Sequence, residues 1–170
     1  MVTRQGRLRR AVLGHLDSPD VARIIYGSVV GLAVVVALQV HPPTAAQAAG
    51  IVFATGLAIG LAELYAEIIG AETRSRRPVE RRELREMLRQ AGAATLGAAF
   101  PAIFFVLAAA GAFDLGLAFR LAKWTGLGLI CGYGYLASRL TGQTVLRSLV
   151  HAAAVGAIGG ALIAFKALLH

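Results

Sequence analysis

Glu63 and Glu67 are the residues whose types and spacing best suit chemistry in this chain. They stand four apart in the apolar run GLAIGLAELYAE, and residues at i and i+4 of a helix lie one above the other on one face. A charge near the bilayer centre costs about 2.5–3.5 kcal/mol even on lenient insertion scales, so an acid in a membrane helix indicates a function. Stacked carboxylates can hold a divalent cation or shuttle a proton. We predict a metal site at this pair.

A structural interpretation of the same two residues stays open. Glu67 can lie at the membrane interface and pair with Arg23 or Arg74. Glu63 lies deeper, because at about 1.5 Å per residue it is on the order of 9 Å from the end of the run near Ile69. A purely structural role is therefore harder to assign to Glu63 than to Glu67.

Three other polar residues within apolar runs have simpler interpretations. Arg120 and Lys123 lie in the outer half of a later span, where their long stems can reach the headgroups, with Asp114 as a partner. His151 is one isolated imidazole, which is more typical of packing than of metal binding. The sequence has no nucleophile with a matching base, no phosphate loop and no His/Cys metal cluster, so we expect no enzymatic activity.

Composition indicates that a lipid bilayer surrounds these residues. Of the 170 residues, 57% are apolar and only 15% are charged, and the mean hydropathy is +0.68. An ordinary soluble domain does not have this balance. The 20 glycines and the 7% aromatic content suit closely packed membrane helices. The single cysteine, Cys131, excludes an internal disulfide and a cysteine-based metal cluster.

Membrane-spanning helices must therefore position the two glutamates. A helix needs about 20 residues to cross about 30 Å of hydrocarbon. We predict an all-α polytopic membrane protein with a five-helix domain over 21–170, whose spans are about 21–40, 45–69, 91–111, 115–138 and 146–168. A basic arm over residues 1–20 precedes this domain, and a basic loop over residues 71–90 joins the second and third spans.

Basic residues predict the orientation of the chain. The net charge is +8, from 17 lysines and arginines and nine acids. Fourteen of the 17 lie in the arm and the start of the first span, in the loop, or at Arg139 and Arg147. Under the positive-inside rule these regions are cytosolic, so the N-terminus lies inside and the C-terminus outside. We expect a multi-pass protein of a bacterial plasma membrane.

The loop over residues 71–90 is the predicted partner-binding segment. After Pro78 it fits a short amphipathic helix that runs into the third span, and on this helix Arg81, Arg85 and Arg89 form a row suited to lipid phosphates. Because the arginines lie between apolar spans, we expect anionic lipid headgroups as partners and no nucleic acid. Two alternatives remain, which are a weak metal site at Glu80, Glu83 and Glu86, and a solvated face with an Arg82–Glu86 pair.

Small residues and one proline predict how the helices pack. Gly27 and Gly31 form a small-xxx-small pair, as do Gly56 and Gly60, and such pairs let helix backbones approach each other. The set favours compact packing and a homodimer. Pro101 lies inside the third predicted span and should kink it.

The order of these landmarks resembles the VIT family of vacuolar iron transporters and their bacterial relatives. RIIYGSVVGLAVVVAL is similar to the family's first helix, and GLAIGLAELYAE is similar to the second, with Glu63 on the family's glutamate. ATLGAAFPAIFFVL places Pro101 on the proline of the third helix. The run from Gly128 to Leu162, which contains the Arg139–Arg147 linker, resembles the fourth and fifth helices.

The resemblance implies a five-helix protomer, a homodimer with a cation path between subunits, and exchange of Fe²⁺ or Mn²⁺ against protons. The chain departs from the family pattern at the ligand positions. Val30 and Val29 stand at the first-helix aspartate and asparagine, and Ile59 and Ala58 stand at the second-helix methionine and serine. The cytosolic metal-collecting domain is reduced to the arginine-rich loop. The chain thus resembles a divergent bacterial-type member without that domain.

Two functions follow from the sequence. The first is transport of iron or manganese across a membrane, coupled to protons, with Glu63 and Glu67 from two subunits as a ring of carboxylates and no tightly bound cofactor. The alternative is a membrane scaffold of the same fold that transports nothing and binds lipid or a protein partner through the arginine loop.

Overall fold

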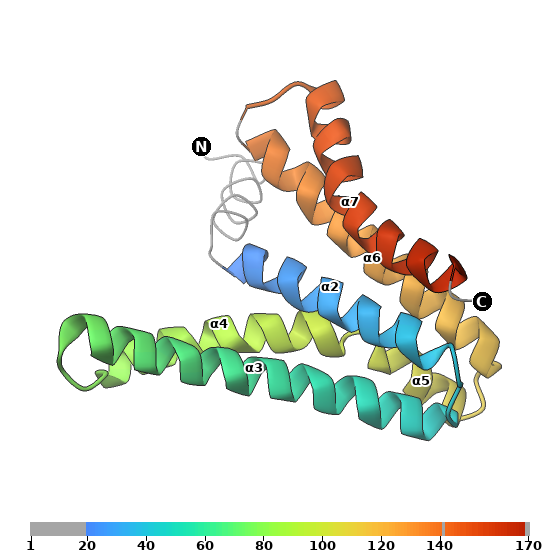
Figure 1. The fold of residues 1–170 in the computed structure, drawn as a ribbon, viewed down its shortest axis with the longest axis horizontal. Helices are drawn as coiled ribbons and strands as arrows, with labels where there is room; N and C mark the ends of the chain where they lie inside the picture. Colours follow the sequence, from blue (N-terminus) through green and yellow to red (C-terminus); the bar gives the residue numbers. More distant parts are fainter. Residues whose placement is uncertain (1–19, 141, 169–170) are drawn as a thin grey trace, which may run out of the picture.

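The computed structural model describes residues 20–140 and 142–168, and every regular element in that part of the chain is an α-helix (Figure 1). The all-α prediction is therefore confirmed. Of the predicted basic arm, only Asp20 belongs to the described residues. The helices are α2 (Asp20–Leu38), α3 (Ala45–Ser75), α4 (Arg81–Ala99), α5 (Ala102–Ala109), α6 (Leu115–Leu140) and α7 (Val145–Leu168).

The helices alternate in direction. α3 and α4 run antiparallel side by side, α2 lies along them, and α6 and α7 form a second hairpin against α2 (Figure 1). The turn between α3 and α4 and the start of α2 therefore lie toward one end of the molecule. The connections from α2 to α3 and from α5 to α6 lie toward the other end (Figure 1).

Local sequence fixes the limits of α3. Pro42 and Pro43 stop the preceding helix, and Thr44 begins α3 with a capping box in which its hydroxyl accepts from the Gln47 backbone N–H. α3 ends at Arg76, whose left-handed backbone lets its N–H donate to the Glu72 carbonyl. At 31 residues, α3 is about 46 Å long, which exceeds the hydrocarbon thickness of about 30 Å.

The amphipathic helix expected after Pro78 forms the first turns of α4. Glu80 caps it and Glu83 completes the capping box, so the helix begins at Arg81 and continues without interruption to Ala99. The axis then bends by 51° between α4 and α5. The kink predicted at Pro101 is thus observed, and its cause is the missing N–H and the bulk of the proline ring. Pro101 is fully buried at the bend.

Small residues bring α2 and α3 into backbone contact with α4. A Cβ at Gly31 would lie 2.5 Å from the Ala98 carbonyl oxygen, and one at Gly27 would overlap the Ala94 carbonyl. On α3, a Cβ at Gly56 would lie 2.7 Å from the Ala99 side chain. Gly27 and Gly31 therefore pack against a helix of the same chain, α4.

The apolar core lies where α2, α3, α5 and α6 meet. Its buried side chains include Val35, Val52, Phe105 and Phe119. The two phenylalanine rings pack edge to face with centroids 4.8 Å apart. This core lies toward the end of the molecule opposite the charged turn between α3 and α4 (Figure 1).

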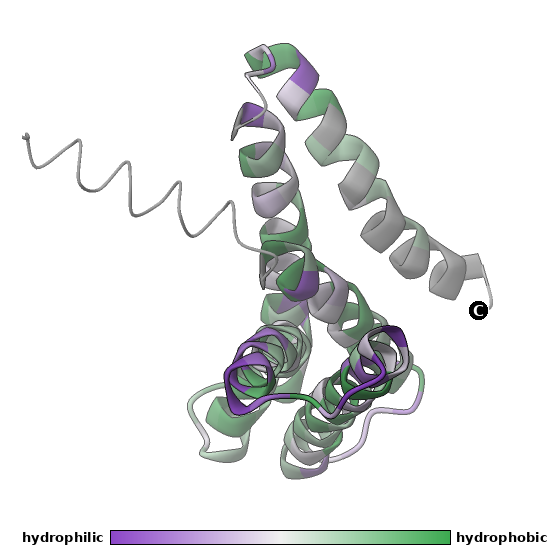
Figure 2. Cartoon of the chain, turned by 90° about the vertical axis from the view of Figure 1, so that its left-hand side faces the viewer, coloured by the Kyte–Doolittle hydropathy of each residue, from purple (hydrophilic) through white to green (hydrophobic). Residues whose placement is uncertain are grey.

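Among the residues that the structure describes, two helices are long and apolar enough to cross a membrane, and these are Val21–Leu38 of α2 and the whole of α3. The bent pair of α4 and α5 is a third candidate if it forms one span. These helices indicate a membrane protein, and polar residues concentrate near the turn between α3 and α4 (Figure 2). α6 has sufficient length at 26 residues, but charged, glycine and tyrosine residues reduce its apolar character. Within the part of α7 whose side chains the structure describes, Val145–Ala154 is apolar.

Candidate functional site

One arginine holds both membrane glutamates. Arg23, in the first turn of α2, donates from Nη1 to Glu63 Oε1 and from Nη2 to Glu67 Oε1. The two carboxylates lie on one face of α3 because they are four residues apart. A guanidinium presents its N–H groups as a rigid fork, so one arginine can reach both carboxylates. We call Arg23, Glu63 and Glu67 the membrane triad.

The membrane triad is largely shielded from solvent. The side chains are 19% exposed for Arg23, 22% for Glu63 and 26% for Glu67. Two carboxylates and one guanidinium leave one net negative charge. In addition, Glu63 Oε2 is buried and accepts no hydrogen bond from any described residue. A buried acceptor without a partner costs about 1–3 kcal/mol, so this oxygen is where a proton or cation gains most.

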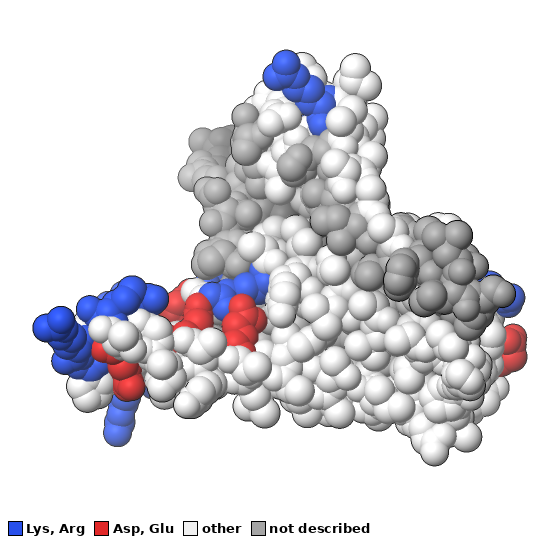
Figure 3. Space-filling view, viewed as in Figure 1, with Lys and Arg blue, Asp and Glu red and all other residues white. Residues whose placement is uncertain are grey.

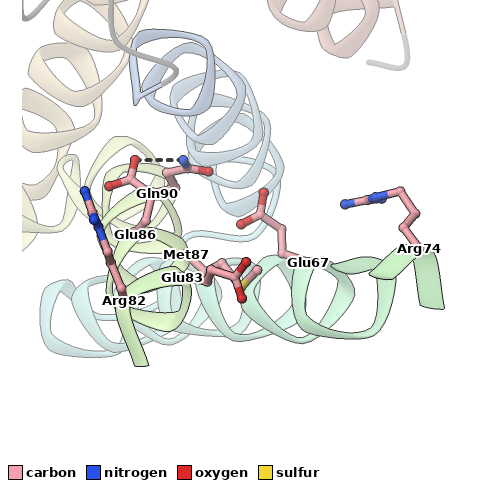
Figure 4. Close-up of a pocket in the computed structure, with 7 residues that line it drawn as sticks. All are labelled: Glu67, Arg74, Arg82, Glu83, Glu86, Met87 and Gln90. Carbon is pink, nitrogen blue, oxygen red and sulfur yellow. Dashed lines mark hydrogen bonds between the residues drawn. The ribbon is translucent and has the colours of Figure 1, made fainter. Parts of the chain in front are cut away.

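Two open cavities lie beside the membrane triad. One, of about 540 Å³, is lined mainly by small and apolar residues of α3, with Glu63 at its wall together with Tyr26 and Thr55. The other, of about 560 Å³, lies between α3 and α4. It is lined by Glu67 and Arg74 of α3 and by residues of the first turns of α4. Glu67 and Glu83 point into it from facing helices (Figure 4). Glu63 therefore opens on one cavity and Glu67 on the other.

The described residues offer few further metal ligands. They contain no group of three or more His, Cys, Asp and Glu side chains placed to hold a metal ion. In the cavity beside Glu63, Ala58 and Ile59 contribute apolar surface. The Thr55 hydroxyl there donates to the Ile51 carbonyl. Within one chain, the pair can exchange a proton, whereas a dehydrated divalent ion needs oxygen ligands from elsewhere.

The glutamates of the charged turn are already engaged. Arg77 lies 3.1 Å from Glu80 and 2.7 Å from Glu83, and the Glu80 backbone N–H also donates to Glu83. The hydrogen bond from Arg77, followed by that from the Glu80 N–H, lowers the pKa of Glu83. The same partnership raises the pKa of Arg77. These ion pairs favour the solvated-face interpretation over a metal site at Glu80, Glu83 and Glu86.

The predicted arginine row is only partly available to a ligand. Arg89 donates to Glu86 from Nε at 3.1 Å and from Nη2 at 2.5 Å. Glu86 thus pairs with Arg89, three residues away, in place of the predicted Arg82. Arg81 and Arg85 are exposed on α4, and no ion pair joins either of them to a described residue. Both guanidinium groups are therefore open to solvent and to a ligand.

The pairing of Arg23 with Glu63 was not expected from the sequence, which suggested Arg23 only as a partner of Glu67. The signal for it was present, because Arg23 is the one basic residue at the start of the first apolar run. Arg120 is exposed on α6, as expected for a residue that reaches the headgroups, and Lys123 is half-buried. The side chain of His151 lies outside those that the structure describes.

Comparisons with protein-family models, curated proteins and solved structures find no match to this chain. The likeness to vacuolar iron transporters therefore rests on the sequence patterns alone.

Proposed function

We propose that this chain is a multi-pass membrane protein that exchanges a divalent cation, Fe²⁺ or Mn²⁺, for protons. The observation that carries the proposal is the membrane triad, in which two carboxylates on one helix face share one guanidinium and keep a net negative charge. Carboxylates shielded from water are costly to retain, and in membrane helices they mark ion or proton paths. The cavities that Glu63 and Glu67 line give each carboxylate an opening to the surface of the chain.

In this proposal Arg23 is a tethered counter-cation. While no ion is bound, its guanidinium neutralises half of the negative charge of Glu63 and Glu67. A divalent ion bound to the same oxygens would be repelled by a neighbouring guanidinium, so it must displace Arg23. Protonation of either carboxylate removes its negative charge and so weakens its ion pair with Arg23. Ion and proton therefore compete for one set of oxygens, which is the requirement for exchange.

The further ligands come from a second copy of the chain. A homodimer that faces two Glu63 side chains and two Glu67 side chains toward each other supplies four carboxylates. Five crossings, with the N-terminus and the charged turn in the cytosol of a bacterial plasma membrane, agree with the arginine distribution. The resemblance to the VIT family supports this arrangement.

The proposal is tested by Mn²⁺ and Fe²⁺ flux into liposomes that contain the purified protein. We expect uptake with the wild type, loss of uptake with Glu63→Gln, and wild-type uptake with Glu80→Gln. The last variant is a matched control, because it removes a carboxylate from an exposed ion pair and because Glu80 lines neither of the two cavities. Flux that Glu63→Gln leaves unchanged would reject the carboxylate site.

A second candidate is a membrane scaffold that transports nothing. It is favoured by the engagement of both carboxylates with Arg23 and by the lack of a three-ligand metal group in residues 20–140 and 142–168. In that case neither the wild type nor any variant moves metal. Neutralising Arg81, Arg85 and Arg89 would then abolish binding of a partner or of lipid.

A further inference from the structure

One face of α4 joins basic and apolar side chains that are all exposed. Arg81 and Arg85 begin the face, Leu88 and Leu96 follow, and Phe100 ends it. Leu88 is 50% exposed, Leu96 71% and Phe100 40%. At about 100° per residue, these positions fall within an arc of about 120° on the helix. We call this surface the α4 stripe.

The positive charge of the α4 stripe is not neutralised by its neighbours. Glu80 and Glu83 bind Arg77, and Glu86 accepts from Arg89 and Gln90, which leaves no nearby carboxylate of the described residues for Arg81 and Arg85. Two like charges at i and i+4 also repel each other. Lys and Arg side chains gather at this end of the molecule (Figure 3). An anion held between the two guanidinium groups would neutralise their charge and relieve their mutual repulsion.

The apolar part of the α4 stripe has a gap for a slender apolar group. Gly92 lies between Leu88 and Leu96 along the helix, and a Cβ added there would meet nothing within 4 Å. The stripe is continuous with the bent pair of α4 and α5, which is a candidate membrane span. From Arg81 to Leu96 the helix rises about 22 Å. One bilayer leaflet with its headgroups measures about 20–22 Å.

We propose that the α4 stripe binds an anionic phospholipid. Its phosphate lies between Arg81 and Arg85, and one acyl chain follows Leu88, Gly92 and Leu96. A free phosphate ion would contact only Arg81 and Arg85. An acidic soluble protein would account for the basic residues but not for exposed apolar residues that extend over the length of one leaflet. The assignment makes no use of the membrane triad and holds whether or not the protein transports metal.

The test measures retention of phosphatidylglycerol against phosphatidylcholine by the purified full-length protein in detergent micelles, with native mass spectrometry as the readout. A basic residue near an anionic lipid surface contributes roughly a fivefold change in affinity. We therefore expect the double variant Arg81→Gln/Arg85→Gln to bind phosphatidylglycerol roughly 30-fold more weakly. Arg81→Lys/Arg85→Lys should retain most of the affinity, which separates loss of charge from loss of folding.

The matched control is Arg82→Gln. Arg82 is exposed and adjacent in sequence, but it points about 100° away from Arg81 around the helix and lines the cavity between α3 and α4. We expect Arg82→Gln to change phosphatidylglycerol retention less than twofold, and Gly92→Leu to weaken retention of both lipids. An Arg82→Gln effect equal to that of Arg81→Gln would show that only diffuse charge attracts the lipid. Displacement of the lipid by millimolar inorganic phosphate would show a phosphate site only, and either result overturns the proposal.

Discussion

Arg23 lies in the first turn of α2 and reaches two carboxylates that are four residues apart on α3. The spacing of Glu63 and Glu67 could be predicted from sequence, because it depends only on helix periodicity. The double contact could not, because it joins residues 40 and 44 positions apart and depends on how α2 packs. Hydropathy patterns carry no information about that packing.

Removing Arg23 should destabilise the protein. Arg23→Gln leaves two shielded carboxylates without a counter-charge, and breaking a buried ion pair in this way costs about 3–5 kcal/mol. Because the side chains keep about a fifth of their exposure, we expect roughly 3 kcal/mol, the lower end of that range. Chemical denaturation in detergent measures the change. Adding Glu63→Gln and Glu67→Gln to the Arg23→Gln variant should recover most of the lost free energy of unfolding. An Arg23→Gln protein as stable as the wild type would contradict the ion-pair account.

The start of α4 should loosen as the pH falls through the lowered pKa of Glu83. Hydrogen bonds from Arg77 and from the Glu80 N–H lower the pKa of Glu83 in the folded protein. The stabilisation from Glu83 is therefore fully present above the ordinary glutamate pKa and is lost as the pH falls through the lowered value. NMR titration of the Glu83 carboxyl carbon gives its pKa, and amide exchange at the start of α4 gives the loosening. The Arg77→Gln variant should raise that pKa, whereas a Glu83 pKa at or above the ordinary value in the wild type would contradict the hydrogen bonds that Glu83 accepts.

At the scale of whole helices, backbone contact decides how α2 and α3 lie on α4. Gly27 and Gly31 were predicted to pack helices together, and the described contacts place both against α4 of the same chain. The limits of the helices could be predicted less well at the charged end. α3 continues to Ser75, beyond the predicted end at residue 69, because hydropathy reports the apolar segment, whereas backbone hydrogen bonds continue the helix into water. In the same way, α4 begins at Arg81, before the predicted start of the third span at residue 91, because its first turns are polar.

A methyl group should have opposite effects at two glycines of these helices. Gly31→Ala places a Cβ 2.5 Å from the Ala98 carbonyl oxygen, and such overpacking costs about 1–3 kcal/mol. Gly50→Ala meets nothing within 4 Å and should stabilise α3 by about 0.5–1 kcal/mol through its higher helix propensity. Thermal unfolding of both variants in detergent compares them. If Gly31→Ala proved as stable as Gly50→Ala, the close contact between α2 and α4 would be wrong.

Over the whole molecule, charge and apolar surface are separated along the long axis. Lys and Arg side chains cluster at the end formed by the turn between α3 and α4, and most of the remaining visible surface is uncharged (Figure 3). The membrane triad lies between this end and the apolar core. An ion that enters from the charged turn meets Glu67 first and Glu63 second, and the α4 stripe would hold this end at the headgroups of one leaflet.

The central claim is that shielded carboxylates bind a passing cation in exchange for protons. The most direct test records internal Mn²⁺ and internal pH together in liposomes that contain wild-type protein, Glu63→Gln or Glu80→Gln. We expect Mn²⁺ entry with simultaneous proton exit in the wild type and in Glu80→Gln, and neither signal in Glu63→Gln. Mn²⁺ entry that persists in Glu63→Gln, or no entry with any of the three proteins, would contradict the claim.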